Sequence, residues 1–332
     1  MRYAIELLVL FLTALTAPVD DALAQAPDQT KRVGFIVWSA YGPRGHLEQA
    51  LVDAMRDRGY IEGKNLVIER RYVDAGGIEQ VRVAASELAA LKLDAIVSTR
   101  SPSTAAVKQA TANSSTPVVM AVVSDPVSQA LIASYDHPGG NVTGLSSQQE
   151  DTLPKMLQYL SELLPSASGV AVLHNTGNPV HPLLWQRLEK AGRELGTRLV
   201  RIDVSGRKDF GAAFDTIQRE RLAALLVLPD DNMTFNSRVQ LLEMVQTQRI
   251  PTMFGAREFV DAGGLMSYGP NYAAGYRQAA VYLDKVLVGA KPANLPVEQP
   301  TRFEFVVNVA AAKALGVAIP PRLLLRADDV VR

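Results

Sequence analysis

Short apolar runs alternate along the chain with segments whose apolar residues recur every three or four positions. Such runs occur at residues 33–39 (VGFIVWS), 94–98 (DAIVS) and 169–175 (GVAVLHN). After the first run, Leu47 and Leu51 are four residues apart, which places them on one face of a helix. Strands separated by helices of about 10 to 15 residues are typical of βαβ crossovers. The pattern therefore predicts an α/β protein with doubly wound parallel sheets.

The same pattern occurs twice. LDAIVST (93–99) and LAALLVLP (222–229) occupy equivalent places in the two halves, and each leads into a polar loop and a helix start. We therefore expect two similar Rossmann-like lobes. Three extended or turn-rich stretches, at 138–147, 261–271 and 301–308, suit crossings between the lobes and would form a hinge. Ordinary connecting loops are the alternative interpretation of these stretches.

The predicted division of the chain has three parts. They are a signal peptide (1–24), an N-terminal lobe (31–142 plus 270–300) and a C-terminal lobe (143–269 plus 301–332).

The first residues have the layout of a cleavable secretory signal. Arg2 precedes an apolar run at 4–17, and an A-x-A site follows at 22–24. The run is shorter than the roughly 20 apolar residues that a membrane-spanning helix needs. The chain has no cysteine, so it lacks both disulfides and the lipid-bearing cysteine of a lipoprotein. These features predict an exported, periplasmic protein.

Composition narrows the class of partner. The 332 residues are 48% hydrophobic and 20% charged, an ordinary globular balance with enough apolar material for two cores. Lysine plus arginine and aspartate plus glutamate both number 34, so the formal net charge is zero. No basic surplus is available to neutralise phosphates, which argues against a nucleic-acid partner.

Catalytic motifs are missing. GYIEGKN (59–65) shares only a Gly-Lys pair with a P-loop, and no glycine pair extends to G-x-G-x-x-G. The four histidines form no H-E-x-x-H and no convergent metal-ligand spacing. A serine is a poor nucleophile without a neighbouring base, and none is placed to serve. The sequence thus predicts a binding protein rather than an enzyme, with no metal and no cofactor.

A cluster of hydroxyl groups follows one central strand, in IVSTRSPST (96–104). Pro102 suits the first helical turn, which leaves Ser101 as the expected N-cap. In open α/β sheets, ligands bind outside the carboxyl ends of the strands, where helix N-termini attract anions. We therefore expect this loop to hold a ligand carboxylate. Simple capping of the helix is the alternative.

Other strand-end loops offer similar groups at 124–127, 174–179, 228–235 and 254–259. Asp125, Asp230 or Asp231 could face a ligand ammonium or could cap helices. Arg257 could pair with a ligand carboxylate or with Glu258. Three aromatic residues are candidates for apolar or stacking surface: Tyr41, Phe235 and Tyr268.

These loops, in this order, resemble a known family. VGFIVWS, RDRGYIEGKNLVIERRYVDAGG, STPVVMAVVSDPV, HPGGNVTGLSS and REFVDAGGLMSYGPN are similar to segments of the ABC-transporter substrate-binding family, as is the C-terminal tail from Lys291. Its better-known members include presumed receptors for tryptophan or other aromatic amino acids. The resemblance implies a type I periplasmic binding protein fold, three crossing segments and a ligand held between the lobes. Arg100 stands where relatives often have a small residue.

The candidate ligand-binding residues come from these strand-end loops. They are Ser39, Tyr41, Thr99, Ser101, Ser103, Thr104, Ser124, Asp125, Asn175, Asn178, Asp230, Asn232, Arg257, Glu258 and Tyr268.

The predicted function is that of a monomeric solute receptor. It would bind an amino acid or a related carboxylate and deliver it to a membrane permease, a partner implied by the resemblance. A periplasmic receptor that reports ligand to a signalling partner is one alternative, because the same two-lobed switch would serve it. A secreted α/β enzyme is a weaker alternative, since it would need a general base that the sequence does not show.

Overall fold

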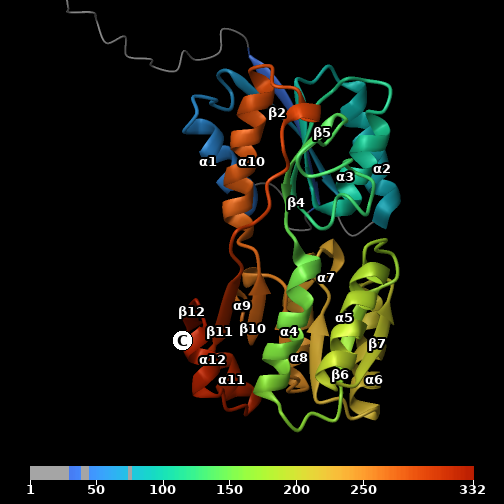
Figure 1. Cartoon of the computed structure of the whole chain (residues 1–332), viewed down its shortest axis with the longest axis vertical. Helices are drawn as coiled ribbons and strands as arrows, with labels where there is room; N and C mark the ends of the chain where they lie inside the picture. The colour runs from blue at the N-terminus through green and yellow to red at the C-terminus, as the bar shows by residue number, and fades with distance from the viewer. Residues whose placement is uncertain (1–29, 39–44, 74–76) are drawn as a thin grey trace, which may run out of the picture.

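The computed structural model describes residues 30–38, 45–73 and 77–332. The predicted signal peptide and the candidate residues Ser39 and Tyr41 lie outside these ranges. The described chain forms two α/β lobes, one above the other in Figure 1, which confirms the predicted fold class.

The first lobe is built on a five-stranded parallel sheet in the order β2-β1-β3-β4-β5. Helices α1 and α10 cover one face, and α2 and α3 cover the other. The strands are β1 (Lys31–Trp38), β2 (Leu66–Val73), β3 (Ala95–Thr99), β4 (Val118–Val123) and β5 (Val142–Ser146). The helices are α1 (His46–Arg56), α2 (Gly77–Ala90), α3 (Arg100–Ala110) and α10 (Tyr272–Leu287).

The second lobe is built on a seven-stranded sheet in the order β12-β11-β10-β9-β8-β6-β7. Only the β10–β11 pairing is antiparallel among its described strands. The strands are β6 (Val170–Asn175), β7 (Leu199–Val204), β8 (Ala224–Val227), β9 (Thr252–Phe254), β10 (Met266–Gly269), β11 (Glu304–Asn308) and β12 (Asp329–Val331). The helices are α4 (Gln149–Leu163), α5 (His181–Leu195), α6 (Phe210–Arg219), α7 (Asn232–Asn236), α8 (Arg238–Thr247), α9 (Arg257–Asp261), α11 (Val309–Leu315) and α12 (Pro321–Arg326).

Each central strand is buried on both faces. In β3, Ile96 packs with α2 and α3, while Val97 belongs to the cluster on the α1–α10 side. In β8, Leu225 and Leu226 likewise belong to two different hydrophobic clusters, one on each face of the sheet. Successive side chains of a strand point to opposite faces. This two-sided burial explains why these strands read as unbroken apolar runs.

The chain crosses between the lobes three times: after β5, between β10 and α10, and between α10 and β11. The first and third crossings lie side by side, because Ser146 N donates to the Glu298 carbonyl at 2.9 Å and Glu298 N donates to the Gly144 carbonyl at 3.0 Å. The lobe boundaries stay a prediction, but strand pairing places β5 in the first sheet, past the expected boundary at 142.

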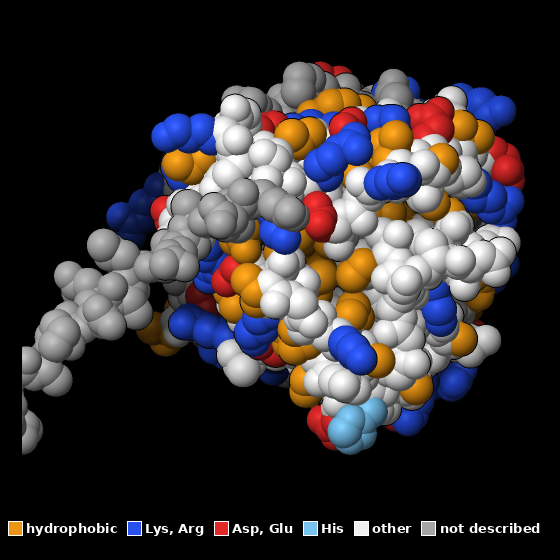
Figure 2. Space-filling model, turned by 90° about the horizontal axis from the view of Figure 1, so that it is seen from above, with side chains coloured by type: hydrophobic (Ala, Val, Ile, Leu, Met, Phe, Trp, Pro, Cys, Tyr) orange, Lys and Arg blue, Asp and Glu red, His pale blue; other side chains and the backbone are white. Residues whose placement is uncertain are grey.

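Charged side chains of both signs lie on the end of the first lobe (Figure 2). Figure 2 views the molecule from this end and shows Lys and Arg side chains interspersed with Asp and Glu. This agrees with the zero formal net charge of the sequence. Among the described residues, no helix has the length and apolar character that a membrane span requires.

Candidate functional site

The two lobes meet through the loops at the carboxyl ends of their central strands. The loop after β3 leads into α3, and the loop after β8 leads into α7. The Ser101 hydroxyl donates to Asp230 Oδ2 at 2.6 Å, and both residues are buried. The structure thus brings into contact two loops that the sequence analysis assigned to the ligand site.

Ser101 does not cap its helix, contrary to our expectation. Helix α3 begins at Arg100 with Thr99 in the N-cap position, and no side chain there bonds to the first turn. The hydroxyl of Ser101 instead reaches across to the carboxylate of Asp230. Because the helix begins one residue before Ser101, this residue lies in the first turn rather than at the N-cap, and its hydroxyl is available to donate to a carboxylate. The segment after Ser124 forms turns and no helix.

Asp230 is the most buried carboxylate at this contact, with 1% of its surface exposed. Oδ2 accepts from Ser101, whereas Oδ1 accepts no hydrogen bond from the described residues. Burial raises the pKa of Asp230 to about 6, although Arg100, the Ser101 hydroxyl and the backbone N–H groups of Ser124 and Ser101 favour the charged form. Its backbone is left-handed, with φ of 57°. The residue thus holds a partly satisfied carboxyl group in a fixed position.

Arg100 projects into the same space from the first lobe and is 7% exposed. Its guanidinium carbon lies 4.6 Å from the ring centre of Phe235 and 5.0 Å from that of Tyr272. Nη1 donates to the Tyr272 hydroxyl at 3.4 Å. Side chains of Arg100, Asp230 and these two rings, with Phe259, line a cavity of about 10 Å³. That is about the space that one water molecule needs, so the side chains around Arg100 and Asp230 nearly fill this cavity.

The other hydroxyl groups of the first lobe are buried nearby. Thr104 donates to the Arg100 carbonyl at 2.9 Å and shares a 2.8 Å bond with Ser98. The Ser103 hydroxyl has no partner among the described residues. Ser124 shares a 3.3 Å bond with Ser147, at the first crossing. The bonds of Thr104 hold the loop around Arg100 in place.

A second, larger cavity of about 280 Å³ opens beside this contact. From the second lobe it is lined by three of the predicted amide residues, Asn175, Asn178 and Asn232. Asn178 Nδ2 donates to the Asp230 carbonyl at 2.8 Å, and Asn175 Nδ2 donates to Asp231 Oδ1 at 2.9 Å.

The first lobe contributes to this cavity through Pro102 and the start of α2. Residues from both lobes thus line it. It is large enough for a small molecule and lies next to Arg100 and Asp230.

Two predicted acidic residues face charged or polar groups of the opposite lobe. Asp125 Oδ2 lies 3.3 Å from an Arg187 nitrogen on α5. Glu258 Oε1 lies 3.3 Å from His46 Nε2 on α1. These contacts join the lobes on either side of the site.

Two other candidates lie elsewhere. Arg257 pairs with Asp329 at 2.6 Å and does not pair with Glu258. Tyr268 packs edge-on against Tyr159, with ring centres 5.5 Å apart, in the core of the second lobe.

Sequence reasoning missed two polar residues that meet at the hinge. Gln149 begins α4 directly after the first crossing, and its Nε2 donates to the Tyr272 hydroxyl. Tyr272 begins α10 directly after the second crossing and is buried. Nothing in the local sequence brings the two together, since they are 123 positions apart.

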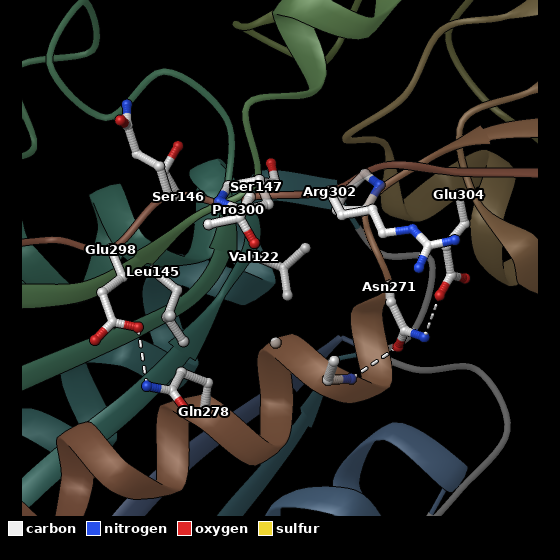
Figure 3. Close-up of a pocket in the computed structure, with 15 residues that line it drawn as sticks. Val122, Leu145, Ser146, Ser147, Asn271, Gln278, Glu298, Pro300, Arg302 and Glu304 are labelled. Atoms are coloured by element: carbon white, nitrogen blue, oxygen red, sulfur yellow. Dashed lines mark hydrogen bonds between the residues drawn. The ribbon is translucent and has the colours of Figure 1, made fainter.

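A further cavity of about 440 Å³ lies against the hinge itself and is drawn in Figure 3. Its polar rim includes Asn271, which donates to Glu304 at 2.9 Å, and Gln278, which donates to Glu298 at 2.9 Å. Val122 and Leu145 supply apolar side chains at the ends of β4 and β5. No cluster of three or more metal-binding side chains occurs within the described ranges.

Comparisons with known proteins agree with this architecture. The family model of the ABC transporter substrate binding protein matches residues 43–331. A tyrosine-binding protein of Clostridioides difficile (strain R20291) is 25% identical over 269 residues, which are 81% of this chain and 76% of that protein.

Two solved structures are similar over nearly the whole chain. A conserved domain protein of Vibrio cholerae superposes with a TM-score of 0.82 at 26% identity, over 91% of this chain and all of that one. A Streptococcus pneumoniae domain in complex with L-Trp gives a TM-score of 0.78 at 22% identity, over 90% of this chain and all of that one. With two lobes, three crossings and a family match across both lobes, the chain belongs to the ABC transporter substrate-binding proteins.

Proposed function

We propose that this protein is the periplasmic receptor of an ABC importer and that it carries an amino acid or a closely related carboxylate. The observation that carries the proposal is the buried contact between Ser101 of one lobe and Asp230 of the other. It is supported by the family match and by two relatives, one described as tyrosine-binding and one crystallised with L-Trp. Delivery to a membrane permease follows from membership of the family.

The proposed mechanism is closure of the lobes around the ligand. A ligand that contacts both lobes shifts the population toward the closed arrangement. The size of the shift is set by the difference between its affinities for the closed and the open arrangement. Asp230 offers an unpaired carboxylate oxygen that suits an ammonium group. The hydroxyl groups of the α3 loop and the amides of Asn175 and Asn178 supply further hydrogen bonds.

The test is a binding panel on the protein from Gln25 onward, against amino acids, other carboxylates, nucleosides and sugars. At a hundredfold excess over Kd, a true ligand stabilises the folded state by about 2.7 kcal/mol. For lobes of this size, that raises Tm by roughly 5–10 °C. We expect only amino acids or carboxylates to respond and to be recovered chemically unchanged. A response confined to sugars or nucleosides, or conversion of the ligand, would refute the proposal.

A further inference from the structure

Arg100 is a buried cation with too few partners. A guanidinium has five N–H donors. In this structure, one of its nitrogens donates to the Tyr272 hydroxyl at a long 3.4 Å. No carboxylate of the described residues lies within ion-pair distance of it, although Asp230 attracts it electrostatically. Moving an ion of this kind out of water costs several kcal/mol unless other groups replace the lost hydrogen bonds.

The two aromatic rings do not supply that replacement. Phe235 and Tyr272 attract the guanidinium through cation–π contacts at 4.6 and 5.0 Å. Each such contact contributes about 0.5–2 kcal/mol and satisfies no N–H donor. The rings therefore hold the guanidinium in position while leaving most of its hydrogen-bonding capacity unused.

A buried carboxylate lines the same cavity without touching Arg100. Asp230 Oδ2 is engaged by Ser101, but Oδ1 has no partner among the described residues. Both residues line the cavity of about 10 Å³. Both also have left-handed backbones, with φ of 62° and 57°, a strained conformation that persists only where the surroundings impose it. A positive and a negative group are thus fixed on opposite lobes, each with unused hydrogen-bonding capacity.

We infer that Arg100 is a specificity-determining residue that requires the ligand to present a carboxylate. The inference rests on the proposed function. In this arrangement the carboxylate of an amino acid pairs with the Arg100 guanidinium, while its ammonium faces Asp230 Oδ1. Planar guanidinium groups bind carboxylates through two parallel hydrogen bonds, a geometry that a neutral amide cannot match. Because the present cavity is small, binding requires the guanidinium to turn on its flexible stem or the lobes to separate.

The experiment compares each amino acid with its own carboxamide. The probes are L-tyrosine with L-tyrosinamide, L-tryptophan with L-tryptophanamide and L-leucine with L-leucinamide, measured by calorimetry. The proteins are wild type, Arg100→Met, Arg100→Lys and a control, Arg193→Met, which alters an exposed arginine on α5. We expect wild type and the control to bind at least one acid about 10- to 100-fold more tightly than its amide. Arg100→Met should reduce that ratio to less than about 3-fold by weakening binding of the acid.

The Lys variant keeps the inference testable where the Met variant does not fold. Lysine retains the charge but cannot form the two parallel hydrogen bonds of a guanidinium. The acid should therefore bind several-fold more weakly, while the affinity for the amide is unchanged. The role of Arg100 would be overturned if the Met variant kept the acid-to-amide affinity ratio of wild type, or if the Lys variant bound the acid as tightly as wild type. Either result would leave the proposed function standing. Failure of wild type to bind any amino acid in the full panel would overturn the proposed function itself.

Discussion

Replacing Gly269 by alanine tests how closely two backbone segments of the second lobe pack at the point where the chain leaves that lobe. Gly269 ends β10, directly before the second crossing. A Cβ atom at this position would lie 2.0 Å from the Gly255 carbonyl oxygen, whereas real Cβ atoms essentially never come within 3.0 Å of another heavy atom. The backbones that follow β9 and β10 would have to separate by at least about 1 Å. Overpacking of this kind typically costs about 1–3 kcal/mol.

The measurement is the free energy of unfolding from urea denaturation of wild type, Gly269→Ala and a matched control, Gly211→Ala. Gly211 lies in α6, and a Cβ there would meet nothing within 4 Å. Alanine is the better helix former, so the control should gain up to about 1 kcal/mol. We expect Gly269→Ala to lose about 1–3 kcal/mol. Equal unfolding free energies for the two variants would refute the view that the backbone contact excludes a side chain.

Three further predictions concern the contact between the lobes and the core. Ser101→Ala removes a hydrogen bond to a charged group worth about 1.5–3 kcal/mol, so calorimetry should show amino-acid binding weakened by roughly 10- to 150-fold. The folded pKa of Asp230 is raised from 3.8 to about 6, so wild type should lose stability as pH rises through this range. In urea denaturation at pH 7, Asp230→Asn should therefore be more stable than wild type by up to about 3 kcal/mol. At pH 4 the variant should be no more stable than wild type. Phe214→Ala, at a fully buried position in α6, should lower the unfolding free energy by about 3–5 kcal/mol in the same assay, while an unchanged value would contradict its place in the core.

The alternation of apolar runs and helical segments was enough to predict the two lobes, because strands buried on both faces and helices with one apolar face leave distinct patterns. It also placed Ser101 and Asp230 at strand ends, where parallel sheets present their loops. It did not show which way a side chain turns after its strand. Arg257 follows β9 and Tyr268 lies near the end of β10, yet one pairs with Asp329 and the other packs against the second core.

The contacts that complete the site depend on how the lobes are placed against each other. Tyr272 meets Gln149 and Arg100 because the second crossing returns the chain to the first lobe at that point. Such a contact joins residues more than a hundred positions apart and has no local periodicity. Sequence patterns report local burial, so they predict the elements of this site better than the pairings between them.

The three crossings also have a consequence for the order in which the protein can fold during synthesis. Helix α10 packs against α1, so one face of the first sheet lacks one of its two covering helices until residue 287 has been made. The second sheet lacks β11 and its edge strand β12 until residue 331 has been made, since β12 spans Asp329–Val331. Each lobe is therefore completed only after a segment far along the chain has been made. Contacts of such long sequence separation form slowly, which prolongs the time the nascent chain spends without its complete tertiary structure.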